Sequence, residues 1–159
     1  MKKITSLVLS FAFVLTACGG PDTGNPTAMG EEVANNYKAV MQEITDLMNA
    51  GHSAEELMPK AELLKDDYIV IFVELGKTRM GYSEEDKALF DAAATPFGLL
   101  SNEEFKEFSD GQSKYRSEDL DLGNLLSSFN TLTQYAFFEL LQEQNPDEVE
   151  RLGLGEYLE

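Results

Sequence analysis

Residues 31–51 read EEVANNYKAVMQEITDLMNAG, and this segment carries the clearest helical pattern of the chain. Its large apolar side chains recur every three or four residues, at Val33, Tyr37, Val40, Met41, Ile44, Leu47 and Met48. That spacing places them on one stripe of an α-helix, and Gly51 suits the position that follows a helix end. The segment therefore predicts an amphipathic helix whose apolar stripe packs against other helices.

A second helix is predicted from Ser53, because Ser53 and Glu56 have the spacing of a capping box. Pro59 lies beyond the first turn, so we expect a kink or a separate first turn there. Residues 68–73 read YIVIFV and are rich in β-branched and aromatic side chains, which also favours a strand. We prefer a helix because no second strand-like run exists for pairing. Together with Tyr135 and Phe138 of the last long helix, Ile69, Val70 and Val73 make more apolar surface than one bundle stripe needs.

Two shorter helices are predicted in the middle of the chain. The acidic residues that follow Ser83 suit the first turn of a helix, which Thr95-Pro96 should end. Ser101 and Glu104 form another capping box and open a short helix. Asp110-Gly111 is expected to stop that helix.

The last third of the chain predicts one long helix between two turns. Residues 119–124 are turn-like, and the apolar pattern that follows continues to about Gln144. Asn145-Pro146 then opens a last short helix, with proline at its first position. The sequence as a whole predicts an all-α domain over residues 31–159, folded as an irregular four-helix bundle with short extra helices.

The N-terminus has a different character. Residues 1–17 read MKKITSLVLSFAFVLTA: a basic start, an apolar core and a small-residue site, which is the layout of a secretory signal peptide. The alternative is a transmembrane helix, which needs about 20 apolar residues. The apolar core here is shorter, polar residues interrupt it, and Gly19-Gly20-Pro21 follows soon after it. We therefore predict cleavage.

The tetrapeptide Leu15-Thr16-Ala17-Cys18 resembles the lipobox of bacterial lipoproteins, and the resemblance covers about the first 19 residues. It implies that a diacylglycerol is attached to the Cys18 thiol and that a signal peptidase cuts before this residue. Gly19 in place of aspartate implies the outer membrane, if the cell is Gram-negative. Residues 18–30 are rich in glycine and proline and are predicted to form a flexible tether behind the lipidated cysteine.

Composition limits the chemistry that the chain is expected to perform. The chain has 29 acidic and 12 basic residues, a formal net charge of −17, which repels nucleic acids and anionic lipid headgroups. The same charge favours a basic envelope protein as partner, although solubility alone also explains it. Cys18 is the only cysteine and His52 the only histidine. We therefore expect no catalytic residues, no metal site and no cofactor.

The candidate partner surface consists of Tyr135 and Phe138. On a continuous helix to Gln144, Phe138 points away from the core stripe and Tyr135 flanks it, unless neighbouring helices cover both. An exposed apolar patch there would mark a partner or dimer surface. The expected function is that of a non-enzymatic interaction, accessory or inhibitor module, tethered to the envelope through Cys18. The alternative is a carrier of a small apolar ligand in a cavity between helices. The oligomeric state stays open.

Overall fold

A computed structural model describes residues 23–95 and 100–158 of the chain. The predicted signal peptide, the lipidation site Cys18 and the first part of the predicted tether lie outside these residues. Within the described ranges the chain forms seven α-helices and two 3-10 helices, with no strand. The prediction of an all-α fold is therefore confirmed.

Helices α1 (Pro26–Asn49) and α2 (Ala54–Met80) lie side by side and run in opposite directions. Helix α1 begins at Pro26, so the prediction that residues 18–30 form a flexible tether is wrong for its last five residues. The Asn25 side chain caps the helix by accepting from the Ala28 amide at 3.2 Å, and Pro26 suits the first turn. Gly30 lies against α3, where a Cβ would come within 2.3 Å of the Phe90 carbonyl oxygen.

Residues 68–73 are helical, as expected from the sequence, because they lie within α2. It begins with the predicted capping box of Ser53 and Glu56 and continues through Pro59 to Met80. Tyr68, Ile69, Phe72 and Val73 are all buried, because α2 packs against α1 on one side and against α5 and η1 on another. The apolar run is therefore the part of α2 that faces several neighbours at once.

Helices α3 (Glu84–Ala93) and α4 (Asn102–Glu118) follow, and α4 is longer than predicted. The prediction that Asp110-Gly111 stops this helix is wrong. Gly111 lies against α1, where an added Cβ would be 3.0 Å from the Met48 Cε atom. The glycine thus lets two helices approach closely, and tertiary contact offsets its low helix propensity.

The predicted long helix to Gln144 is wrong, because the chain divides it into three elements. These are α5 (Leu120–Ser128), the 3-10 helix η1 (Phe129–Ala136) and α6 (Phe138–Gln144). Ser128 Oγ donates to the Leu125 carbonyl at 2.6 Å, and Thr131 Oγ1 donates to the Ser128 carbonyl at 3.0 Å. Such side-chain bonds compete for helical carbonyls. Phe137, at φ −127° and ψ 81°, then leaves the helical region altogether.

The architecture is an irregular four-helix bundle with short helices added at one end. Helices α1, α2, α4 and the α5–η1 segment surround a shared core, and α4 crosses α1 at a steep angle. Helices α3, α6, α7 (Pro146–Arg151) and the 3-10 helix η2 (Leu154–Tyr157) lie at the opposite end from α4. This arrangement leaves one face of the α1–α2 pair without a third helix.

Tyr115 of α4 fixes the turn between α1 and α2. Its ring is fully buried, and its hydroxyl lies 2.7 Å from the His52 carbonyl oxygen and 3.2 Å from that of Met48. Because a buried carbonyl without a donor is unfavourable, Tyr115→Phe should lower the free energy of unfolding by about 1–2 kcal/mol. Urea denaturation measures the change. An unchanged midpoint would show that the two carbonyls do not depend on this hydroxyl.

Candidate interaction surface

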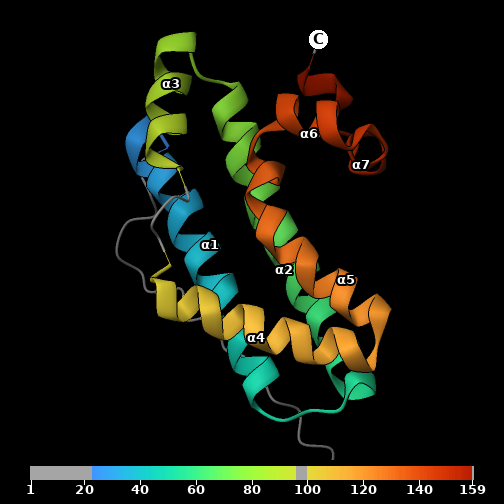
Figure 1. Ribbon diagram of the computed structural model, residues 1–159. Helices are drawn as coiled ribbons and strands as arrows, with labels where there is room; N and C mark the ends of the chain where they lie inside the picture. Colours follow the sequence, from blue (N-terminus) through green and yellow to red (C-terminus); the bar gives the residue numbers. More distant parts are fainter. Residues whose placement is uncertain (1–22, 96–99, 159) are drawn as a thin grey trace, which may run out of the picture.

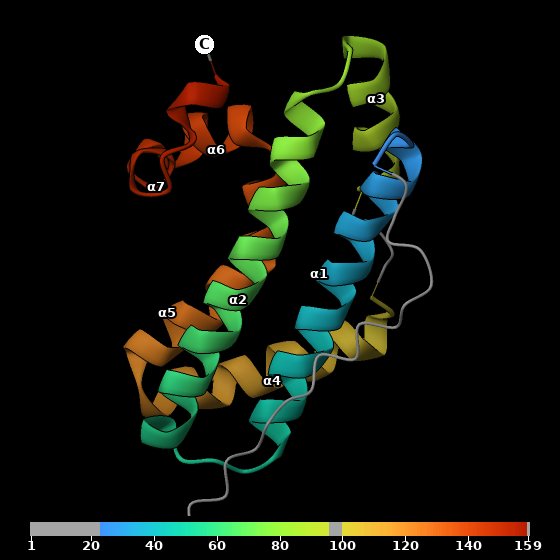
Figure 2. The same cartoon turned by 180° about the vertical axis from the view of Figure 1, so that it is seen from behind.

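The outer face of the α1–α2 pair is a helical face that the other described elements leave open. Figure 2 shows the two helices in front, with α4, α5 and η1 behind them, and none of the other described elements crosses this face. Two hollows follow the seam between the helices, and all their lining residues belong to α1 or α2. We call this surface the α1–α2 face.

The lower hollow has a volume of 640 Å³ and lies near the α1–α2 turn. Its apolar lining comes from both helices and consists of Leu47, Leu63 and Leu64. Glu43 and Asp46 line it on α1, and Lys60 and Asp67 line it on α2. The hollow is an open groove with leucines between charged residues, whereas a carrier of apolar ligands needs an enclosed apolar cavity.

The upper hollow has a volume of 400 Å³ and continues the same seam towards α3. Val70, Ile71 and Leu75 line it on α2, and Met29 lines it on α1. Acidic residues again stand beside the apolar ones, with Glu32 on α1 and Glu74 on α2. The two hollows therefore form one elongated surface of similar composition.

The α2 side of this surface is a single exposed stripe. Leu63, Asp67, Val70 and Glu74 follow one another at i, i+4, i+7 and i+11, which places them within about 60° around the helix. Leu63 is 64 % exposed and Val70 is 63 % exposed, the highest values among the large apolar side chains of the described residues. Apolar and acidic residues thus alternate along the stripe.

The two helices are joined across the seam by a hydrogen bond. The Tyr68 hydroxyl of α2 donates to Glu43 Oε1 of α1 at 2.8 Å. Burial raises the pKa of Tyr68 far above its ordinary value, and the bond to Glu43 raises it further. Tyr68 therefore stays a protonated donor at physiological pH. The bond fixes the spacing between the two walls of the α1–α2 face.

The α1–α2 face is more acidic than basic. Five carboxylates line the two hollows: Glu32, Glu43, Asp46, Asp67 and Glu74. Lys60 is the basic residue among the lining residues, and its ammonium lies 2.7 Å from His52 Nε2. Beside the face, Lys77 pairs with Glu74 at 2.7 Å. The surface therefore keeps an excess of negative charge.

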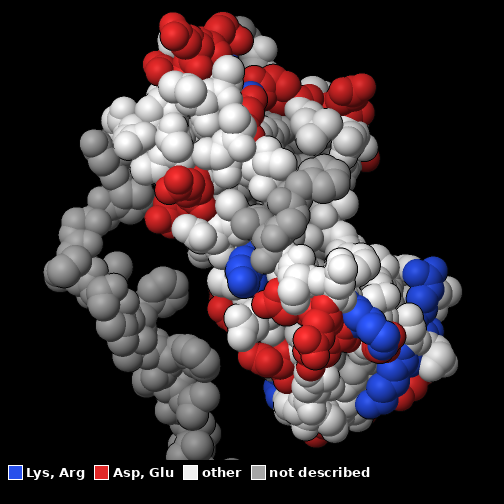
Figure 3. Space-filling model, turned by 60° about the vertical axis from the view of Figure 1, so that its left-hand side comes forward, with Lys and Arg blue, Asp and Glu red and all other residues white. Residues whose placement is uncertain are grey.

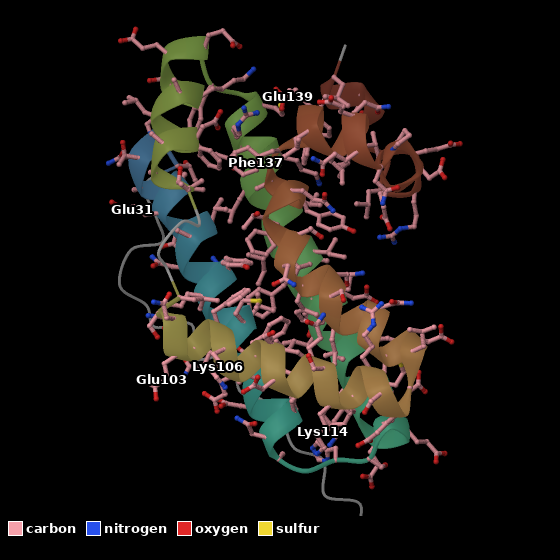
Figure 4. All side chains as sticks on the ribbon, viewed as in Figure 1. Glu31, Glu103, Lys106, Lys114, Phe137 and Glu139 are labelled. Atoms are coloured by element: carbon pink, nitrogen blue, oxygen red, sulfur yellow. The ribbon has the colours of Figure 1, made fainter. Side chains whose placement is uncertain are left out.

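Basic side chains gather on another part of the molecule. In Figure 3 the visible Lys and Arg residues lie mainly in the lower half, mixed with Asp and Glu residues. Helix α4 carries Lys106, Lys114 and Arg116. Lys106 pairs with Asp110, and the Lys114 ammonium lies 5.1 Å from the centre of the Tyr115 ring. Figure 4 shows Lys106 and Lys114 on α4, which lies in front of α1 in that view. The charge is thus unevenly spread over the protein.

The predicted partner surface of Tyr135 and Phe138 is wrong, because both side chains are buried. Tyr135 is 4 % exposed and Phe138 is fully covered. The non-helical backbone at Phe137 turns α6 away from the line of η1, so positions 135 and 138 do not share the face that a continuous helix would give them. The Phe138 ring packs against Gly76 and Tyr157. Burial raises the pKa of Tyr135.

The sequence indicated this exposed surface only in part. Of the apolar residues that exceeded one bundle stripe, Ile69 and Val73 are buried and Val70 is exposed. Leu63 was not singled out, although the seven-residue interval to Val70, with Asp67 between them, is visible in the sequence. That interval, on a helix whose other faces are apolar, is the signal that identifies the stripe.

The most elaborate polar cluster is centred on Arg79 at the end of α2. Arg79 is buried; its Nε and Nη2 atoms donate to Asp91 of α3 at 2.7 and 3.0 Å, and Nη1 donates to Glu139 of α6 at 2.8 Å. The guanidinium also lies 5.3 Å from the centre of the Phe137 ring. Figure 4 shows Phe137 and Glu139 at this junction of α2 and α6. The cluster joins α2, α3 and α6, because the Arg79 guanidinium forms ion pairs with both Asp91 and Glu139.

Residues 23–95 and 100–158 hold no group of three or more His, Cys, Asp or Glu residues placed to bind a metal ion. They also contain no helix that is long and apolar enough to cross a membrane. His52 contacts Lys60 at the α1–α2 turn.

Comparison with known protein families, with curated proteins and with solved structures finds no match for the chain. Any proposal about function therefore rests on the residues of the chain and on their arrangement.

Proposed function

We propose that the protein is a non-enzymatic interaction module of the bacterial cell envelope. Lipid on Cys18 tethers it to a membrane, and the α1–α2 face binds another envelope protein. The observation that carries this proposal is the exposure of Leu63 and Val70 on an uncovered face. Leu47, Leu64 and Ile71 line the same hollows, and an exposed apolar patch that is rimmed by polar residues is typical of a protein-binding surface.

The tether is supported by the lipobox-like residues Leu15-Thr16-Ala17-Cys18 behind a basic and apolar start. Two or three acyl chains hold a protein to a bilayer, whereas a single chain binds only marginally. The net charge of −17 repels anionic headgroups, so attachment depends on the lipid rather than on the protein surface. A tether raises the local concentration of the domain near other envelope proteins.

Site-specific photo-crosslinking in the host bacterium tests this function. A photoreactive amino acid at position 63 of the full chain should form an adduct with another envelope protein. The same residue at position 120 is the matched control, because Leu120 is 60 % exposed and Leu63 is 64 % exposed, on different helices. Position 120 should give no specific adduct.

The anchor is tested in the same cells. The Cys18→Ser variant should leave the membrane fraction, and its adduct from position 63 should decrease. Equal adducts from positions 63 and 120, or none from either, would count against an interaction module that uses this face.

A further inference from the structure

The stripe on α2 defines the chemistry of what covers it. Leu63 and Val70 are seven residues apart, and Asp67 and Glu74 follow each of them by four residues. All four side chains are exposed, and their spacing places them on one side of α2. Side chains seven residues apart lie on the same side of a helix, and the positions between them that are apolar in a coiled-coil seam are here Asp67 and Glu74. The stripe thus offers apolar and acidic contacts in turn along one line.

From this pattern we infer that the α1–α2 face binds a basic amphipathic α-helix of a partner protein, laid along the seam between α1 and α2. The inference rests on the proposed function and specifies the partner. Apolar side chains of the bound helix would contact Leu63 and Val70. Lysine or arginine side chains at its flanking positions would meet Asp67 and Glu74 on one wall, and Glu43 and Asp46 on the other.

The dimensions of the face suit a helix. From Lys60 to Thr78, the lining residues span about 27 Å of α2 at 1.5 Å per residue. The hollows of 640 and 400 Å³ follow one line between two antiparallel helices. An amphipathic helix bound in such a groove is a common mode of peptide recognition, with anchors at i, i+3, i+4 and i+7. The span corresponds to about 18 residues of the bound helix.

The charge of the face selects a basic helix over other occupants. Five carboxylates line the hollows; Tyr68 binds Glu43 and Lys77 pairs with Glu74, and the face still keeps an excess of negative charge. A second copy of this chain, docked by the same face, would bring those carboxylates against their own copies, which like-charge repulsion opposes. An anionic lipid surface is opposed for the same reason. Lysines and arginines on the occupant would instead form pairs at the rim.

Charge reversal with mapped crosslinks tests the inference in the full chain, expressed in the host bacterium. A photoreactive residue at position 70 is combined with Glu74→Lys, or with Glu62→Lys as the control. Both glutamates are exposed on α2, but position 62 lies about 110° away from the stripe. We expect the adduct yield to fall about tenfold with Glu74→Lys and to stay unchanged with Glu62→Lys. Mass spectrometry should place the adduct in a lysine- or arginine-rich amphipathic helix.

The outcomes separate this inference from the proposed function. An adduct in an acidic or extended segment of a partner would overturn the basic helix but leave the interaction module standing. An adduct with a second copy of this chain, or equal yields from both charge variants, would also overturn the inference. If neither position 63 nor position 70 gives an adduct with any protein, the proposed function fails as well. Circular dichroism confirms that each variant keeps its helices.

Discussion

Replacing Phe138 by alanine is expected to lower the free energy of unfolding by about 3–5 kcal/mol. The ring is fully buried, and its centre lies 5.7 Å from that of Tyr157 in an edge-to-face contact. It also occupies the space beside Gly76, where an added Cβ would come within 2.5 Å of the Phe138 ring. Removing the ring leaves a cavity that the backbone of α2 cannot fill. Denaturation of the full chain in urea, followed by circular dichroism, measures the loss.

Leu140→Ala provides the matched control for Phe138→Ala. Leu140 lies two residues further along the same short helix and is exposed. Its replacement should change the free energy of unfolding by no more than about 0.5 kcal/mol, as for most surface positions. Equal effects at positions 138 and 140 would contradict the burial described for Phe138. In the Phe138→Ala variant, the free energy of unfolding could also depend less steeply on urea concentration than in the unchanged protein. That result would show that α6 separates before the rest of the bundle unfolds.

The features that sequence predicted correctly depend on neighbours within one helical turn. The capping boxes at Ser53–Glu56 and Ser101–Glu104 begin helices where the pattern placed them. Hydrogen bonds from Ser53 and Ser101 hold the pKa of Glu56 and Glu104 below its ordinary value. A cap needs only four consecutive residues, so it can be recognised without knowing the fold. The all-α class follows from such local signals together with the apolar stripes.

The features that sequence did not predict depend on contacts between distant residues. Gly111 looked like a helix stop, but Met48 of α1 packs where its side chain would be, and the helix continues. The change from α5 to η1 depends on side-chain bonds that involve residues such as Ser128 and Thr131. Small shifts in winding change which way later side chains point. A helical projection across residues 125–144 therefore misplaced Phe138.

The candidate site also combines a feature that neighbouring residues determine with one that depends on the packing of distant helices. The interval between Leu63 and Val70 can be read from the sequence, and so can the acidic residues between and after them. Whether that stripe is covered depends on where α5 and η1 lie, and they pack against another side of α2. Sequence could thus identify excess apolar surface on α2, as it did at Val70. It could not decide which part of that surface faces water.

The second large effect is expected from Arg79→Met, which should lower the free energy of unfolding by about 2–3 kcal/mol. Removing one partner of a buried ion pair costs about 3–5 kcal/mol when the other charge stays buried. Here Asp91 and Glu139 are partly exposed and can be rehydrated, which reduces the loss. Methionine keeps most of the packing against Phe137, so the change reports mainly on the lost ion pairs. Urea denaturation measures it.

Arg79→Lys separates the charge of this side chain from its shape. Lysine keeps the positive charge but cannot form the two parallel bonds that Nε and Nη2 make to Asp91. We therefore expect about half of the loss seen with methionine to remain. The bond to Asp91 raises the pKa of Arg79 above its ordinary value, so the arginine stays charged until strongly alkaline pH. Its contribution is fully present below the unfolded pKa and is lost only as pH rises through the folded one.

A double-mutant cycle with Asp91→Asn shows whether the two residues act together. If Arg79 stabilises the fold through Asp91, the loss in the double variant should be smaller than the two single losses added together, by about 1 kcal/mol or more. Strict additivity would mean that Arg79 acts through Glu139 and Phe137 instead. Because Arg79 lines neither hollow and lies about 24 Å along α2 from Leu63, the same variants should leave crosslinking from position 63 unchanged. That result would separate the residues that hold the bundle together from those proposed to bind the partner.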